Sequence, residues 1–234
     1  MRSLASLILL AASVCAWAAA PSRIEAEYQL TSRGLPIGRM TETYVRTGDN
    51  YEIHSVSRSE GVLKLVFDER ITLQSTGRVR AEGLQPLRFE ERRTREPRRD
   101  VEASFDWERG VMSSRFRGEV SRHALPPATQ DRISMMYQYQ FMQVKGGRGG
   151  NLTLSMSNGR KIELYTYRLV DEPRIGTPAG EFDTLHFERV TSKANDRHIE
   201  VWLAKSHHHF PVRVVFDDPR GLRVEQTLVA LRTE

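Results

Sequence analysis

Apolar and polar residues alternate with a period of two along most of the chain after position 22. In the first such segment, Ile24, Ala26 and Tyr28 are separated by charged residues. Successive side chains of a β-strand point to opposite faces, so this alternation predicts strands that are buried on one face. Turn signals separate the segments, and Asn158-Gly159 is the strongest of them. The whole pattern predicts about twelve strands.

Two stretches of this pattern give specific expectations. One long strand is expected over 62–75, with turns at Gly77 and at 83–86, where glycine and proline interrupt the alternation. The segment 87–99 is expected to form a pair of strands around Pro97, because proline is poorly tolerated inside a sheet.

The period changes in the segment that follows Pro126-Pro127. Ile133, Met136, Tyr137 and Phe141 recur at i, i+3, i+4 and i+8, as on one face of an α-helix. This spacing predicts a helix over 131–143, the one convincing helix of the mature chain.

The ends of this helix also carry signals. Thr129 or Asp131 is expected at its start, where a short side-chain oxygen accepts a hydrogen bond from an unpaired backbone N–H, and Gly146-Gly147 is expected to end it. Asp131 and Ser134 are three residues apart, so capping explains both better than a catalytic pair does.

The predicted fold is mainly β: an antiparallel β-roll or half-open barrel with one packed α-helix, formed by residues 19–234 as a single domain. The helix is rich in methionine and aromatic residues on more than one side, and methionine adapts to irregular apolar shapes. These residues either complete the core or form the wall of a site for an acyl chain or another apolar ligand. The candidate ligand-binding residues are Met135, Met136, Tyr137, Tyr139, Phe141 and Trp202.

The N-terminus has the three parts of a secretory signal peptide. Arg2 precedes an apolar stretch over 4–16, and small residues at Ala16 and Ala18 predict cleavage after Ala18. The stretch is shorter than the roughly 20 residues of a transmembrane anchor, and Val14 before Cys15 argues against a lipoprotein. We therefore expect residues 1–18 to be removed and the protein to be released into the periplasm. Cys15 is the only cysteine, so the mature chain would have no thiol chemistry.

Charge gives little indication of a partner. The formal net charge is +5, with 35 basic and 30 acidic residues, which does not favour nucleic acid. The segment 87–99 holds six arginines, but Glu90, Glu91 and Glu96 lie among them. Charges of both signs favour a solvated face over a basic stripe for lipid headgroups or phosphates.

The sequence assigns no catalytic residue, metal ligand or cofactor. It contains no nucleophile elbow, zinc-protease helix, phosphate loop or dinucleotide fingerprint. The run from His207 to His209 is expected to be a solvated loop rather than a metal site, because adjacent strand side chains point to opposite faces. A rival hypothesis is a hydrolase of envelope polymers that uses Asp183, Glu188 and Glu200, which requires two carboxyl groups about 5–10 Å apart in an open cleft.

Several motifs together resemble a known family. They are Gly34-Leu35-Pro36-Ile37-Gly38, the Gln130-Asp131-x-x-Ser134 helix start, the turn over 176–183, Val201-Trp202-Leu203-Ala204 and Pro211-Val212-Arg213. In this order they resemble the bacterial secreted proteins of domain-of-unknown-function family 3108, over residues 24–231. The resemblance implies an exported, mostly β protein with a rolled or half-open sheet and a helix against it. No catalytic residues come with it.

The leading hypothesis is a periplasmic, non-enzymatic protein that binds a lipid, another amphipathic envelope molecule or an envelope protein. It predicts an apolar cavity of about 300 Å³ or more against the helix. A scaffold without a small ligand is the third hypothesis, and it predicts an exposed apolar patch or sheet edge instead.

Overall fold

The computed structural model describes residues 21–61, 64, 68–142, 150–191, 196–219 and 221–234. The predicted signal peptide, most of the first part of the strand expected over 62–75, and the glycines expected to end the helix lie outside the described residues. Among the described residues, no helix has the length and apolar character needed to cross a membrane.

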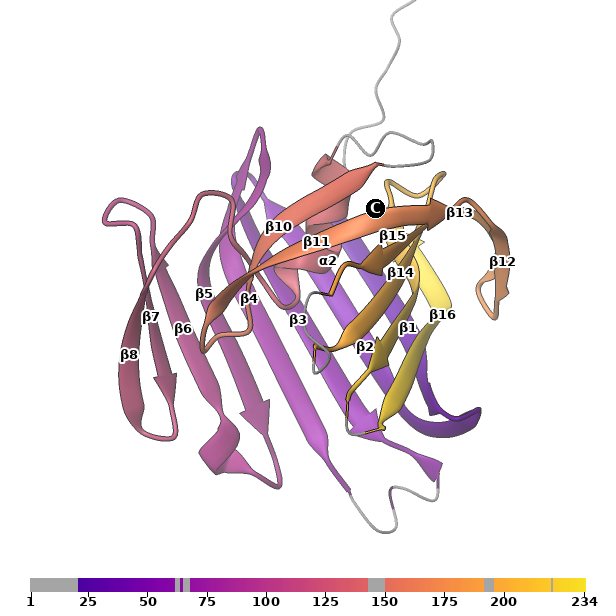
Figure 1. Cartoon of the computed structure of the whole chain (residues 1–234), viewed down its shortest axis with the longest axis horizontal. Helices are drawn as coiled ribbons and strands as arrows, with labels where there is room; N and C mark the ends of the chain where they lie inside the picture. Colours follow the sequence, from indigo (N-terminus) through magenta and orange to yellow (C-terminus); the bar gives the residue numbers. More distant parts are fainter. Residues whose placement is uncertain (1–20, 62–63, 65–67, 143–149, 192–195, 220) are drawn as a thin grey trace, which may run out of the picture.

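The described chain forms one large curved sheet with a short helix on its concave side (Figure 1). Its elements, in chain order, are β1 (Arg23–Ser32), β2 (Leu35–Thr47), β3 (Asn50–Ser59), β4 (Arg70–Arg80), β5 (Gly83–Arg93), η1 (Pro97–Arg99), β6 (Val101–Asp106), β7 (Val111–Phe116), β8 (Glu119–Ala124), β9 (Gln130–Asp131), α2 (Ser134–Gln138), η2 (Tyr139–Phe141), β10 (Asn151–Ser157), β11 (Ile162–Asp171), β12 (Arg174–Thr177), β13 (Gly180–Arg189), β14 (His198–Ala204), β15 (Phe210–Asp217) and β16 (Arg223–Thr233).

Neighbouring strands pair in the order β8-β7-β6-β5-β4-β3-β2-β1-β16-β15-β14-β13-β11-β10-β9, and β12 pairs with β13. Every pair is antiparallel except β9 with β10. β1 lies between β2 and β16, so the two ends of the described chain meet inside the sheet, where the Arg23 N–H donates to the Glu234 carbonyl at 3.1 Å.

The mainly β, half-open fold with a helix packed against the sheet is confirmed for the described residues, but the sheet has 16 strands rather than about twelve. The short strands β9 and β12 contain two and four residues, too few for an alternation to stand out in the sequence. A strand pair lies around Pro97, as expected, but its bounds differ: β5 runs to Arg93, a 3₁₀ turn contains Pro97, and the partner strand β6 begins only at Val101. The turn expected at Gly77 was also wrong: this glycine lies inside β4, where an added Cβ would come 2.7 Å from the Tyr51 ring.

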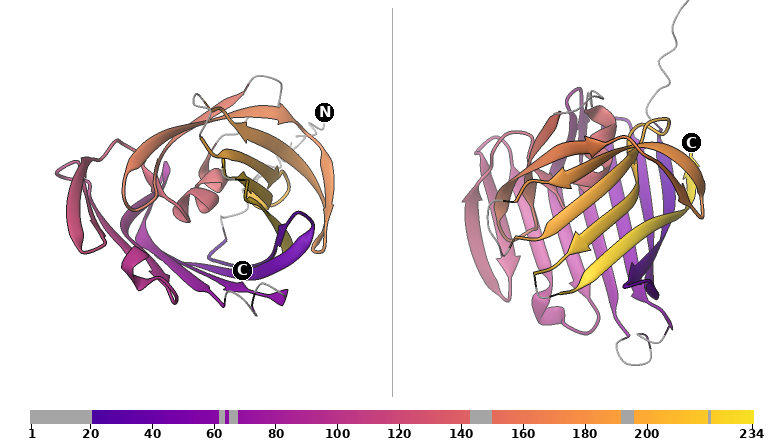
Figure 2. Two further views of the ribbon diagram at one scale, coloured as in Figure 1. Left: turned by 60° about the horizontal axis from the view of Figure 1, so that its bottom comes forward. Right: turned by 45° about the vertical axis from the view of Figure 1, so that its right-hand side comes forward.

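Side-chain contacts bridge the open side of the sheet, where β8 and β9 do not pair. The turn between β10 and β11 reaches across the concave face (Figure 2). There the Ser114 hydroxyl of β7 donates to the Gly159 carbonyl at 2.5 Å, and the Ser157 hydroxyl lies 3.0 Å from the Met112 sulfur. An added Cβ at Gly159 would come 2.5 Å from Val101, so only glycine fits at this contact.

Helix α2 is shorter than predicted and lies inside the arch of the sheet (Figure 2). It covers Ser134–Gln138, continues as a 3₁₀ turn, and ends where Met142 becomes extended, against the predicted range of 131–143. Contacts with β5 and with the turn before it hold the helix in place: the Gln138 side chain accepts from the Leu84 N–H at 2.8 Å and donates to the Glu82 carbonyl at 3.0 Å. Anchoring by tertiary hydrogen bonds allows a helix too short to be stable alone.

Candidate functional site

A cavity of about 470 Å³ lies between the concave face of the sheet and the start of helix α2. Most of the side chains around it are apolar. They are Leu30, Met40, Ile71, Leu73, Ile133, Met135, Met136, Met156, Tyr165, Tyr167, Ile199, Phe216, Leu222 and Val224. A cavity of this size and composition is in the range of small-molecule sites, about 300–1,000 Å³.

The cavity reaches the surface at the ends of β14, β15 and β16. Leu222 is 57% exposed and lines this mouth, together with an ion pair in which Arg197 Nε lies 3.4 Å from Asp218 Oδ2. Phe216 and Val224 are half-buried next to it, whereas Tyr167, farther along the lining, is fully buried. The cavity therefore runs from an exposed mouth to a buried end.

The structure places two of the candidate ligand-binding residues of the helix on the cavity wall, Met135 and Met136. Tyr137 lies behind them, with its ring 5.1 Å from that of Tyr44. Tyr139 is buried in the neighbouring core cluster and Phe141 packs partly buried against the main core. These three residues support the helix and are not part of the cavity lining.

Asp131 and Ser134 hold the turn that leads into the helix, whose N-cap position is Ile133 rather than the expected Thr129 or Asp131. The Asp131 carboxylate accepts from the backbone N–H groups of Ile133 at 3.0 Å and Ser134 at 2.8 Å, and from the Ser75 hydroxyl at 2.5 Å. The Ser134 hydroxyl accepts from the Asp131 N–H at 2.9 Å. Burial raises the pKa of Asp131 to about 6, and these hydrogen bonds oppose the rise.

The buried end of the cavity is polar, which the sequence analysis missed. Glu42 on β2 and Ser55 on β3 are cross-strand partners, and they are 5% and 1% exposed. The Tyr137 hydroxyl donates to Glu42 Oε2 at 3.3 Å. Burial raises the pKa of Glu42 to about 7, and the nearby hydroxyls of Ser55 and Tyr137 oppose the rise. A signal was present, because Glu42 occupies an inward position of the strand between Met40 and Tyr44.

Trp202 lies on the opposite, convex face of the sheet and does not line the cavity. Its ring stacks on that of His186 at a centroid distance of 4.1 Å and an interplanar angle of 5°. The Arg213 guanidinium carbon lies 5.0 Å from the centroid of the Trp202 ring. Alternation along β14 explains the placement, because Ile199 faces the cavity and Trp202 is an odd number of residues away.

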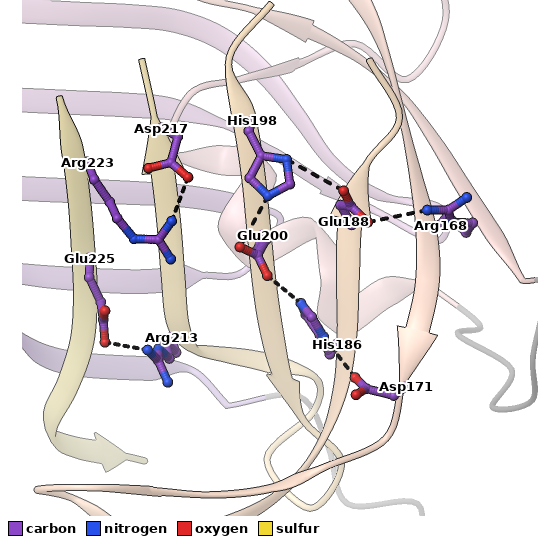
Figure 3. Close-up of polar contacts among 10 residues, drawn as sticks. All are labelled: Arg168, Asp171, His186, Glu188, His198, Glu200, Arg213, Asp217, Arg223 and Glu225. Atoms are coloured by element: carbon purple, nitrogen blue, oxygen red, sulfur yellow. Dashed lines mark hydrogen bonds and ion pairs between the residues drawn. The ribbon is translucent and has the colours of Figure 1, made fainter. Parts of the chain in front are cut away.

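Polar side chains form a chain of contacts on this convex face (Figure 3). His186 Nδ1 lies 2.8 Å from Asp171, and its Nε2 lies 2.9 Å from Glu200. His198 lies between Glu200 and Glu188, at 3.2 Å and 3.6 Å. Neighbouring strands thus hold charged and polar groups at fixed positions on the side away from the cavity.

The three carboxylates of the hydrolase hypothesis do not meet in the cavity. Glu188 and Glu200 are cross-strand partners on the convex face, and both contact His198. Glu188 also pairs with Arg168 at 3.3 Å (Figure 3). Asp183 is exposed on the part of β13 that pairs with β12. These carboxylates are held in ion pairs or exposed, and none lines the cavity.

The arginine-rich segment interleaves both charges, as its sequence indicated. Arg92 contacts Glu90 at 3.0 Å and Glu102 at 2.5 Å. Glu91, which is buried, pairs with Arg93 and with Arg132, each at 2.5 Å. Paired charges in this arrangement stabilise neighbouring strands rather than present an unbroken basic stripe.

The histidine run forms the turn between β14 and β15. His208 and His209 both have a positive φ, and the His207 ring packs edge-on against Phe182 at 5.3 Å. Among the residues that the structure describes, no group of three or more histidine, cysteine or acidic side chains is arranged to hold a metal ion.

Comparisons with known proteins identify a similar fold and the family of the chain. A beta-barrel-like protein of domain-of-unknown-function family DUF1849 from Brucella abortus is similar in structure, with a TM-score of 0.62 and 13% identity over 92% of this chain and 99% of that chain. A putative lipoprotein from Parabacteroides distasonis has a TM-score of 0.37 and 11% identity, over 91% and 97% of the two chains. A search of curated proteins finds no match. The model of the family "protein of unknown function (DUF3108)" matches residues 27–227, and the chain therefore belongs to that family.

Proposed function

We propose that this protein is an exported, non-enzymatic binding protein of the periplasm, which holds an apolar or amphipathic envelope molecule such as a lipid. Residues 1–18 would be removed as a signal peptide, and residues 19–234 would form its single domain. The observation that carries the proposal is the cavity of about 470 Å³ between the helix and the sheet, lined mainly by apolar side chains.

The physical reason is the free-energy cost of exposing the apolar lining of the cavity to water. Leu30, Ile71 and Leu73 line the cavity and are only half-buried. Removing apolar surface from water stabilises the system by about 25 cal/mol per Å². An acyl chain that covers these side chains removes both its own apolar surface and theirs from water, and both contributions favour binding. The methionines of the helix adapt their shape to a flexible chain.

The test is binding of diphenylhexatriene, a hydrocarbon probe that fluoresces in apolar surroundings. Leu73→Trp places an indole ring on the cavity wall, whereas Thr72→Trp places the same ring one residue away on the convex face. We expect the wild type and Thr72→Trp to bind the probe with similar affinity, and Leu73→Trp to bind at least about tenfold more weakly.

Absence of probe binding by the wild type would overturn the proposal. Equal loss in both variants, with circular dichroism spectra that match the wild type, would also overturn it, because the cavity would then not be where the probe binds.

A further inference from the structure

The buried end of the cavity carries polar groups. Leu222 and Phe216 lie toward the mouth, where the Arg197–Asp218 ion pair also lies, whereas Glu42 and Ser55 lie at the buried end. A ligand that enters with its apolar end first would place hydrocarbon against a buried carboxyl and a buried hydroxyl. Polar groups buried without hydrogen bonds cost about 1–3 kcal/mol each, so this order has to be matched by the ligand.

Ser55 and Glu42 have hydrogen-bonding capacity left over. The Ser55 hydroxyl oxygen is fully buried and has no hydrogen-bond partner among the described residues. Glu42 makes no ion pair within the described chain. The Tyr137 hydroxyl donates to it at 3.3 Å, and the Ser55 hydroxyl is close enough to oppose the rise of its pKa. A carboxyl group has about four acceptor positions, so most of those on Glu42 remain open toward the cavity.

We propose that this end of the cavity receives a head group that donates hydrogen bonds, an alcohol, an amide or a protonated amine, with the apolar chain of the ligand extending toward the mouth. The inference rests on the proposed function and names the class of ligand. Glu42 accepts the donated hydrogen bonds, and Ser55 adds a hydroxyl that can donate or accept.

The same geometry disfavours a carboxylate or a phosphate at this position. An anionic head group next to Glu42 would place two like charges together in buried surroundings, which is costly. Arg132 is the other charged side chain of the helix start that lines the cavity, but it already pairs with Glu91 at 2.5 Å. Arg93 also contacts Glu91, so two guanidinium groups share one carboxylate and the three groups keep a net charge of +1. The comparison of head groups measures this residual positive charge against the repulsion of an anion by Glu42.

The experiment compares dodecylamine, dodecanol and dodecanoate as competitors of diphenylhexatriene. The three share one chain, so differences in their affinity report on the head group. For the wild type at pH 7.5 we expect the amine and the alcohol to bind at least about tenfold more tightly than the carboxylate, a difference of about 1.4 kcal/mol. Glu42→Gln should weaken the amine at least about tenfold and bring the carboxylate to within about threefold of the alcohol.

Two controls keep the outcome interpretable. Glu42→Gln preserves the shape of the side chain, and a circular dichroism spectrum that matches the wild type shows that its fold is intact. Glu27→Gln, on an exposed side chain outside the cavity, should leave both the affinity for the hydrocarbon probe and the ranking of the three compounds unchanged. Ser55→Ala removes the unpaired hydroxyl and should weaken the alcohol severalfold more than it weakens dodecanoate.

Dodecanoate binding as tightly as dodecylamine to the wild type would overturn the head-group inference and leave the apolar cavity as a binding site. An unchanged ranking in Glu42→Gln would do the same. If none of the three compounds displaced the probe and the probe itself did not bind, the proposed function would fall instead.

Discussion

The hydroxyl of Tyr137 on helix α2 donates to the carboxyl of Glu42 on β2 across 3.3 Å, in the interior of the protein. This contact joins the helix to the wall of the sheet at the buried end of the cavity. Burial raises the pKa of both groups, so the fold favours the protonated form of each side chain.

Glu42 should make stability depend on pH. Its pKa is about 7 in the folded protein against an ordinary value of 4.5, so folding takes up a proton between these pH values. The free energy of unfolding therefore falls as the pH rises through this window, by about 3 kcal/mol at most. The surrounding phenols of Tyr28, Tyr44 and Tyr137 have raised pKa values and stay neutral throughout.

Glu42→Gln should remove this loss. We expect the variant to unfold in urea with nearly the wild-type free energy at pH 4.5 and to be more stable by up to about 3 kcal/mol at pH 8. The pKa of Asp131 rises to about 6, so the free energy of unfolding of both proteins also falls with pH through the ionisation of this group. Glu27→Gln, on an exposed side chain, serves as the control; equal stability of Glu42→Gln and wild type at pH 8 would contradict the prediction.

Asp131 should be required for the helix start because of its acceptor oxygens rather than its charge. Asp131→Ala leaves the Ile133 and Ser134 N–H groups buried without a partner, and we expect a loss of about 3 kcal/mol in urea unfolding. Asp131→Asn keeps an acceptor oxygen and should cost about 1 kcal/mol. Equal losses in the two variants would show that the charge itself stabilises this end of the helix.

Gly159 should be required for the contact that bridges the open side of the sheet. Gly159→Ala forces a Cβ against Val101 and Phe89 at a φ of +80°, and we expect a loss of about 3 kcal/mol. Gly118→Ala has nearly the same φ, +82°, but open space around it, and should cost about 1 kcal/mol. Thermal unfolding of both variants separates the steric term from the backbone term, and similar melting temperatures would refute the close contact.

Trp202 should contribute to stability without contributing to ligand binding. Trp202→Ala removes the ring that stacks on His186, and a loss of about 3 kcal/mol is expected because the side chain is 8% exposed. The affinity for diphenylhexatriene should match that of the wild type, since the ring lies on the convex face. A tenfold weaker affinity in a folded variant would instead assign Trp202 to the binding site.

Local patterns in the sequence determined the type of fold and the role of the helix start. Alternation over segments such as Arg23–Ser32 depends on the two-residue repeat of a strand, which neighbouring residues alone specify. Asp131 and Ser134 are three residues apart, and the hydrogen bonds between them are local for the same reason. The resemblance to DUF3108, carried by short motifs, is confirmed by the family match over residues 27–227.

The tertiary structure decided which residues meet. Gly77 lies inside a strand, where the close approach of the Tyr51 ring and of β5 leaves no room for a side chain. Trp202 faces away from the cavity because of its register on β14. The short helix is held by Gln138 contacts to β5, more than 50 residues away in the chain. Glu42, Ser55 and Tyr137 come together only when three elements pack, because long-range packing, unlike alternation, leaves no period in the sequence.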